Sequence, residues 1–113
     1  MIQIFHNTRC GKSRGCLAFI KDSGKAYEVI KYLETPPTFQ ELSEVIRKLN
    51  ISPLELVRQN ESVWIESFKD KKMTDVEIIH AMITHPILIE RPIVINGDKA
   101  VIARPAENAK EII

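Results

Sequence analysis

A chain of 113 residues is long enough for one hydrophobic core, and we expect residues 1–113 to form a single domain. Hydrophobic residues make up 44% of the chain and charged residues 27%, a balance typical of a soluble globular protein and not of a disordered or fibrous one. The formal net charge is only +1, so overall charge predicts no binding to nucleic acid or to a membrane surface. Any affinity for anions must come from a few cationic side chains placed together.

The N-terminal residues Met1–His6 show no signal peptide, and no apolar run approaches the roughly 20 residues that cross a bilayer. These observations favour the cytoplasm, where thiols are kept reduced. The two cysteines, Cys10 and Cys16, are too few for a disulfide framework. Each is therefore a buried small residue, a ligand or a nucleophile.

The N-terminal third predicts a strand, a helix and a second strand. Residues that favour strands occupy Ile2–Phe5, and turn-forming residues follow them. From Lys12 the apolar residues recur with helical spacing, until Ser23-Gly24 provides a C-cap. The alternating segment Ala26–Tyr32 is expected to form a second strand, parallel to the first. Together these elements predict a right-handed βαβ unit.

The middle part, roughly residues 38–84, is predicted to be a helical insertion. Thr38 and Glu41 have the spacing of a capping box, and the helix that they start is expected to end at Asn50. Ser52-Pro53 then starts a short helix.

A loose segment is expected around Trp64 and Phe68, before the last helix of the insertion. Thr74 begins that helix, again with a glutamate three residues later. Its predicted apolar face consists of Val76, Ile79, Met82 and Ile83.

The C-terminal third predicts a β-hairpin and a short helix. Two apolar runs flank Asn96-Gly97, which is the strongest short hairpin signal. Pro105 is expected to occupy the first position of the terminal helix. The order βαβ, helical insertion, ββα indicates an α/β protein with a mixed four-stranded sheet, arranged as in the thioredoxin-like fold.

Cys10 lies at the predicted junction between the first strand and the first helix. Unpaired backbone N–H groups and the positive end of the helix dipole favour an anion there, so a thiol at this position ionises more easily. Arg9, Lys12 and Arg14 add positive charge nearby. The same N–H groups suit a tetrahedral oxyanion. The sequence thus predicts either a nucleophile beside an anion site or, less interestingly, a passive small residue.

Cys16 is predicted to be buried on the apolar face of the helix. The pair reads Cys-x5-Cys and the residue three after Cys10 is Ser13, so the motif contains no thioredoxin-type disulfide. At about 1.5 Å per residue, Cys16 is about 9 Å along the helix from Cys10, beyond the usual span of a disulfide. A resolving role for Cys16 is the alternative. Without an internal partner, Cys10 needs an external thiol for a redox cycle.

Three arginines lie at suggestive points far from Cys10. Arg58 follows the short helix of the insertion, whereas Arg91 and Arg104 each precede a proline at the two ends of the hairpin. The planar guanidinium matches an oxyanion two oxygens at a time. Sequence spacing does not show whether they converge, and solvated surface positions are the alternative.

The three histidines have no spacing typical of a metal site, and we predict that the protein has no metal site. His6 lies four residues before Cys10, where it either tunes the thiol or packs at the strand end.

The chain resembles the glutaredoxin-dependent arsenate reductases, known as the ArsC family, in five blocks that follow in register over nearly its whole length. It looks like a shorter branch that lacks their C-terminal extension. The resemblance implies a thioredoxin-like fold with a helical insertion and a cis peptide bond before Pro92. The matching blocks are residues 6–14, 32–37, 58–60, 85–94 and 103–105.

The resemblance also implies the chemistry. Cys10 corresponds to the nucleophile, which attacks the arsenic of arsenate, and a glutathione thiol then reacts with the covalent adduct. Glutaredoxin and a second glutathione complete the reduction to arsenite, so glutathione is a co-substrate and no bound cofactor is expected. The oxyanion ligands are Arg58, Arg91 and Arg104, and the supporting residues are His6, Gly11, Lys12, Ser13 and Pro92.

Two other functions remain open. One is a thiol oxidoreductase that acts on glutathione adducts or on another oxyanion. The other is a non-catalytic, Spx-like regulator that binds RNA polymerase. Such regulators often use Cys-x-x-Cys as a redox switch, and Ser13 together with the retained arginines disfavours that function.

Overall fold

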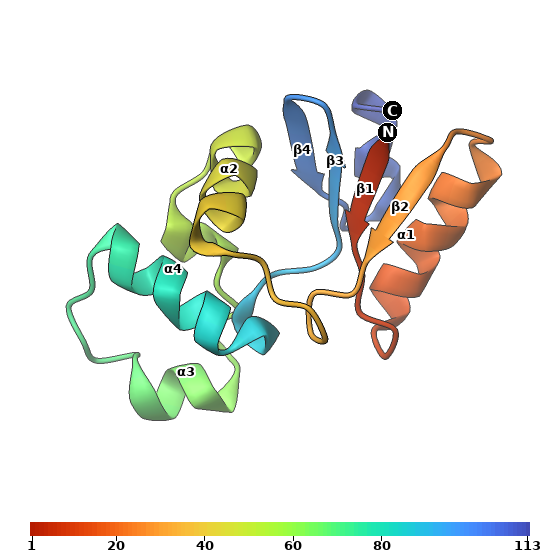
Figure 1. The fold of residues 1–113 in the computed structure, drawn as a ribbon. Coiled ribbons are helices and arrows are strands. Elements are labelled where there is room, and N and C mark those ends of the chain that lie inside the picture. The colour runs from red at the N-terminus through yellow and green to blue at the C-terminus, as the bar shows by residue number, and fades with distance from the viewer. The chain divides into compact units, whose positions relative to one another are not determined.

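Figure 1 shows a small β-sheet built from the first and last parts of the chain, with helices α2–α4 between these two parts in the sequence. The computed structural model describes residues 1–113. The elements follow in the order β1 (Ile2–Phe5), α1 (Gly11–Asp22), β2 (Tyr27–Ile30), α2 (Phe39–Leu49), η1 (Pro53–Leu56), α3 (Ser62–Ser67), α4 (Asp75–Thr84), η2 (Pro86–Leu88), β3 (Ile93–Asn96), β4 (Lys99–Ile102) and η3 (Ala106–Glu111), where η denotes a 3-10 helix.

These elements form two compact units, Met1–Thr35 with Arg91–Ile113, and Pro36–Glu90. The helices predicted between residues 38 and 84 lie in the second unit. That the whole chain 1–113 is one domain stays a prediction. None of the helices has the length and apolar character that a membrane-spanning segment needs.

The first unit contains a four-stranded mixed sheet with the strand order β2-β1-β3-β4. β1 pairs in parallel with β2 and antiparallel with β3, and β3 pairs antiparallel with β4. α1 provides the crossover that two parallel strands require. The predicted βαβ unit, the hairpin and the mixed sheet are confirmed.

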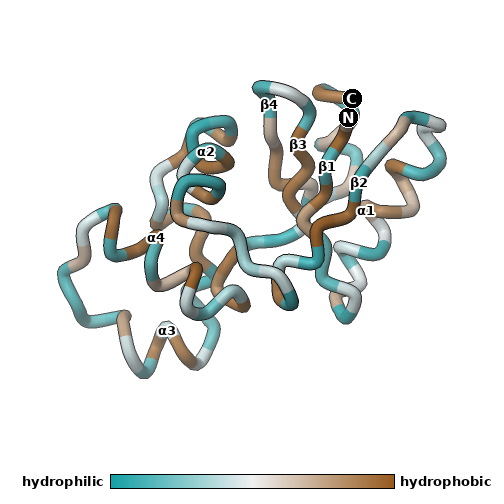
Figure 2. The backbone as a smooth tube through the Cα atoms, viewed as in Figure 1, coloured by the Kyte–Doolittle hydropathy of each residue, from teal (hydrophilic) through white to brown (hydrophobic).

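One face of this sheet carries the buried apolar cluster of the first unit. Alternate side chains of β1 and β3 point to this face and pack with residues of α1 and η3. Figure 2 shows the corresponding concentration of apolar residues along β1 and β3. The buried members of the cluster are Ile2, Ile4, Cys16, Ile20, Val94, Ala103 and Ala109.

The hairpin turn differs from the predicted one by one residue. Asn96 pairs with Lys99, so Gly97 and Asp98 are the two central turn residues. Gly97 has a φ of 62°, which glycine adopts without strain and which a type II′ turn requires at its first central position. Asn96 instead donates from Nδ2 to the carbonyl of Ile112 at 2.6 Å, which ties the hairpin to the C-terminus.

Both prolines that flank the hairpin follow cis peptide bonds. The Arg91–Pro92 bond is cis as expected, and the Arg104–Pro105 bond is also cis. The terminal helix η3 begins at Ala106, so Pro105 is its N-cap residue and not its first helical residue. The prediction for Pro105 was wrong, because its ψ of 170° is extended and not helical.

The second unit confirms both predicted capping boxes. The Thr38 hydroxyl accepts from the N–H of Glu41, whose carboxylate accepts from the N–H of Thr38, and the same arrangement starts α4 at Thr74. Asn50 ends α2 in the left-handed conformation, with a φ of 57°.

Two predictions for the second unit were wrong. The segment around Trp64 is helical, not loose: it forms α3, in which Trp64 is buried and stacks on Phe68. Val76, predicted to lie on the apolar face of α4, is 53% exposed, whereas Ile78 and Ala81 are buried. The buried face of α4 is therefore rotated from the predicted one, because several nearly equivalent apolar stripes exist on a helix this rich in aliphatic residues.

Candidate active site

Four chain segments meet at one edge of the sheet in the first unit. Because β1 and β2 are parallel, the segments that follow Phe5 and Ile30 leave the sheet at the same edge. β3 runs antiparallel to β1, so Arg91-Pro92 enters the sheet there. β4 runs antiparallel to β3 and ends there, immediately before Ala103 and Arg104. The pairing of the strands thus brings Cys10, Arg91 and Arg104 to one end of the unit.

Cys10 is the N-cap residue of α1. Its extended backbone, with a φ of −98° and a ψ of 121°, precedes the first helical turn, and its carbonyl accepts the first helical hydrogen bond from Arg14 at 3.0 Å. No side-chain oxygen caps this helix. The backbone N–H groups of Lys12 and Ser13 instead form hydrogen bonds to the thiol.

The environment of Cys10 favours its thiolate. Burial by itself raises the pKa of the thiol and is the largest single influence. The N–H of Ser13, the charge of Arg91, the N–H of Lys12 and a hydrogen bond from the Arg91 side chain together outweigh burial and lower the pKa. Cys10 is only partly buried, so a reagent can reach it. A partly exposed, electropositive thiol of this kind is typical of a nucleophile.

His6 and Ser13 form a buried pair behind the Cys10 loop. The His6 Nδ1 and Ser13 Oγ atoms are 2.6 Å apart, and His6 is 6% exposed and Ser13 fully buried. Ser13 Oγ also accepts from the N–H of Asn7 at 2.9 Å. Burial and the charges of Lys31 and other nearby cations lower the pKa of His6, so its imidazole is neutral near neutral pH. The pair therefore holds Ser13, and with it the N–H donors to the thiol, in place.

The loop between β1 and Cys10 is held by its own polar groups. Asn7 Oδ1 accepts from the N–H of Arg9 at 3.0 Å, and the Asn7 carbonyl accepts from the N–H of Cys10 at 3.1 Å. The guanidinium of Arg14 donates to the carbonyl of Thr8 at 3.0 Å. Arg14 thus holds the backbone of the loop by a hydrogen bond, a role that its charge and its position in the sequence do not show.

Arg91 and Arg104 lie on adjacent segments. The N–H of Ala103 donates to the carbonyl of Pro92 at 2.9 Å, which joins the segment before β3 to the segment after β4. Arg91 is half-buried, its Nε and Nη1 atoms are inaccessible to solvent, and it contacts the Cys10 thiol. Arg104 is exposed. An exposed guanidinium beside a half-buried one offers donors to an anion from solvent.

Arg58 belongs to the second unit, where it forms an ion pair that the sequence analysis missed. Its Nη1 atom lies 2.7 Å from Oε1 of Glu61, and the two side chains are 17% and 22% exposed. The N–H of Arg58 donates to the carbonyl of Leu88 at 2.7 Å. A glutamate three residues after an arginine, at the start of a helix, was the available signal. Glu61 fixes Arg58 and partly neutralises it.

Cys16 lies in the core of the first unit with no exposed surface. Burial raises the pKa of its thiol to about 11. A thiol that is buried and protonated near neutral pH is a poor nucleophile. These properties support the structural role predicted for Cys16 over the resolving role.

The histidine, cysteine and acidic side chains form no group of three or more that could hold a metal ion. The prediction that the protein uses no metal stays a prediction.

Comparison with known proteins places this site in a family. The model of the ArsC family matches residues 5–112 of the chain. The chain belongs to the ArsC family. Arsenate reductase of Neisseria meningitidis is 39% identical over 99% of this chain and 97% of its own length. Arsenate reductase of Escherichia coli is 42% identical over 99% of this chain and 80% of its own length.

Solved structures of ArsC-like proteins confirm the predicted fold. The arsenate reductase from Vibrio cholerae superposes with a TM-score of 0.94 at 38% identity, over 99% of this chain and 97% of that one. The α/β fold with a mixed four-stranded sheet is thus the thioredoxin-like fold of the arsenate reductases. The roles assigned to individual residues in this ArsC chain remain predictions.

Proposed function

We propose that this protein reduces arsenate to arsenite with glutathione and glutaredoxin, through a covalent adduct between Cys10 and arsenic. The observation that carries the proposal is the Cys10 thiol at the N-terminus of α1, with its pKa lowered by backbone N–H groups and by Arg91. Membership of a family whose relatives are named arsenate reductases supports arsenate as the substrate.

The first step is attack of the Cys10 thiolate on arsenic, which forms a sulfur–arsenic bond while one arsenate oxygen leaves as water. The developing charge lies on the remaining oxygens. Arg91 and Arg104 are the cations at this edge of the sheet that would neutralise it, together with the N–H groups of the first turn of α1. The participation of Arg58 rests on the family resemblance alone.

External thiols supply the electrons. A glutathione thiol displaces a second oxygen as water, so that arsenic(V) is bonded to two sulfur atoms. The glutaredoxin thiolate then attacks the glutathione sulfur, and the electron pair of the sulfur–arsenic bond stays on arsenic, which becomes arsenic(III). Hydrolysis of the remaining bond releases arsenite and regenerates Cys10. A second glutathione reduces the mixed disulfide, so one arsenate oxidises two glutathiones to one disulfide.

The burial of Cys16 supports this use of outside thiols. Cys16 is the only other cysteine in the chain, and it lies in the core with a raised pKa. An internal disulfide would need Cys16 to leave that core. A site with one accessible cysteine requires a second and a third thiol from elsewhere.

A coupled assay tests the proposal. Purified protein is mixed with arsenate, glutathione, glutaredoxin and the NADPH-linked glutathione reductase, and NADPH consumption is followed. We expect consumption that depends on arsenate, is abolished in Cys10→Ser and survives in Cys16→Ala. Absence of Cys10-dependent turnover with arsenate would contradict the proposal. The same assay with other oxyanions and with glutathione-capped thiols identifies an alternative substrate in that event.

A further inference from the structure

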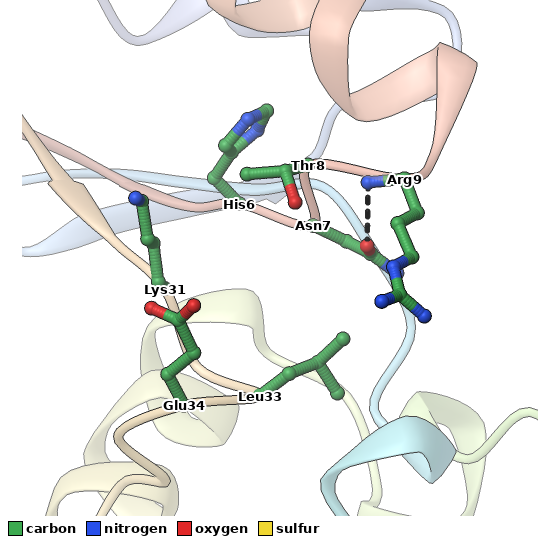
Figure 3. Close-up of a pocket in the computed structure, with 7 residues that line it drawn as sticks. All are labelled: His6, Asn7, Thr8, Arg9, Lys31, Leu33 and Glu34. Carbon is green, nitrogen blue, oxygen red and sulfur yellow. Dashed lines mark hydrogen bonds between the residues drawn. The ribbon is translucent and has the colours of Figure 1, made fainter.

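A pocket of about 270 Å³ lies beside the Cys10 loop in the first unit. One wall is the loop after β1, and the other is the turn after β2, as Figure 3 shows. The N–H of His6 donates to the carbonyl of Ile30 at 2.9 Å, which joins the two walls. The lining residues are His6, Asn7, Thr8, Arg9, Lys31, Leu33 and Glu34.

Two cationic side chains and one anionic side chain line this pocket. Lys31 and Glu34 come from the turn after β2, and Arg9 comes from the opposite wall. All three are exposed to solvent, and no salt bridge joins Lys31 to Glu34. Their backbone positions are fixed, since the N–H of Glu34 donates to the carbonyl of Lys31 at 3.0 Å and Arg9 is held by Asn7. The pocket thus offers two cations and one anion, each carried on a fixed segment of backbone.

We propose that this pocket binds glutathione, with Glu34 receiving its ammonium group and Lys31 and Arg9 receiving its two carboxylates. Glutathione carries one ammonium and two carboxylates near neutral pH, which is the charge complement of this lining. Charge complementarity of this kind selects among small thiols, because a thiol without the γ-glutamyl group leaves two of the pocket charges unmatched. Leu33 provides an apolar surface between the charged groups.

The position of the pocket fits the co-substrate of the proposed reaction, on which this inference rests. Arg9 lines the pocket and is bonded directly to Cys10, so the two α-carbons are about 3.8 Å apart. A glutathione molecule bound along Arg9 keeps its thiol within reach of an adduct on Cys10. Binding here therefore raises the local concentration of the second thiol at the nucleophile.

The test measures binding without chemistry. S-methylglutathione has no thiol, so its titration into the wild-type protein, followed by calorimetry or by NMR shifts, reports the pocket independently of arsenate reduction. We expect saturable binding that weakens about three- to fivefold in Lys31→Gln and in Glu34→Gln, the upper part of the range for exposed ion pairs. The matched controls are Lys25→Gln and Glu111→Gln, which remove exposed charges of the same unit away from the pocket and should leave the affinity unchanged.

A second ligand tests the assignment of the ammonium site. An S-methylglutathione analogue without the α-amino group should bind wild-type protein about three- to fivefold more weakly. In Glu34→Gln the two ligands should bind equally well. An unchanged preference in Glu34→Gln would overturn the assignment of that residue.

The outcomes separate this inference from the proposed function. No saturable binding, or equal binding to wild type, Lys31→Gln and Glu34→Gln, overturns the pocket even if arsenate is reduced. Binding that depends on both residues, in a protein that reduces no arsenate, supports the pocket and contradicts the proposed function. If the pocket binds glutathione and the protein reduces arsenate, the KM for glutathione should rise about three- to fivefold in Lys31→Gln while the KM for arsenate stays unchanged.

Discussion

The buried thiol of Cys16 should make the protein lose stability in alkaline solution, and a Cys16→Ala variant should lack this loss. Cys16 is 0% exposed, and burial raises the pKa of its thiol to about 11. In the unfolded chain the pKa of the thiol has its ordinary value of 9.0. Between these values the folded state keeps a proton that the unfolded chain has lost. The free energy of unfolding therefore falls as the pH rises through this window.

The size of the loss follows from the two pKa values. Each pH unit within the window is worth about 1.4 kcal/mol, so the thiol removes about 1.4 kcal/mol at pH about 10 and about 2 kcal/mol at pH about 11. Below pH of roughly 8 the effect is absent, since both states hold the proton.

Urea unfolding, followed by far-UV circular dichroism at neutral pH and at pH about 10, measures the effect in the parent and in Cys16→Ala. Tyrosines and lysines titrate in both proteins, so the difference between them isolates Cys16. The Cys16→Ala variant loses some stability at every pH because the sulfur no longer fills its place in the core. This constant loss cancels when the change in unfolding free energy between the two pH values is compared between the two proteins. An equal alkaline loss in both proteins would refute the reasoning and reopen a reactive role for Cys16.

Three further substitutions test the site. Arg91→Ala should raise the pKa of Cys10, because it removes a cation and a hydrogen bond, and the pH midpoint of iodoacetamide alkylation should move upward. Ser13→Ala should lower the free energy of unfolding by about 2 kcal/mol, measured in urea, since a buried imidazole and a backbone N–H lose their shared partner. Glu61→Gln should tighten arsenate binding in a calorimetric titration, because Arg58 then no longer carries a neutralising carboxylate.

Each of these has a contradicting result. An unchanged alkylation profile in Arg91→Ala would show that the backbone N–H groups alone determine the Cys10 pKa. Unaltered unfolding of Ser13→Ala would show that the His6 pair adds no stability. The control for Glu61→Gln is Glu44→Gln, which removes the carboxylate of the exposed ion pair with Arg47. If both variants bind arsenate equally more tightly, the gain in affinity comes from net charge and not from Arg58.

The sequence alone determined the features that depend on neighbouring residues. Each predicted capping box involves side chains three positions apart, and such contacts form whenever the helix forms. The position of Cys10 at the start of α1 is local in the same sense, since it follows from the end of one apolar pattern and the start of another. The four strands along the chain followed from residues that favour strands, from alternation in one segment and from the turn residues between them.

Only the tertiary structure decided which distant groups meet. Arg91 reaches the Cys10 thiol because β3 pairs antiparallel with β1, and no spacing along the chain encodes that pairing. The buried face of α4 was likewise chosen by what packs against it, which is why Val76 is exposed. The pocket beside Cys10 exists because parallel pairing sends two loops out of the same sheet edge. Residue patterns specify local geometry through contacts of a few residues, whereas a binding site is a set of long-range contacts that only the folded chain brings together.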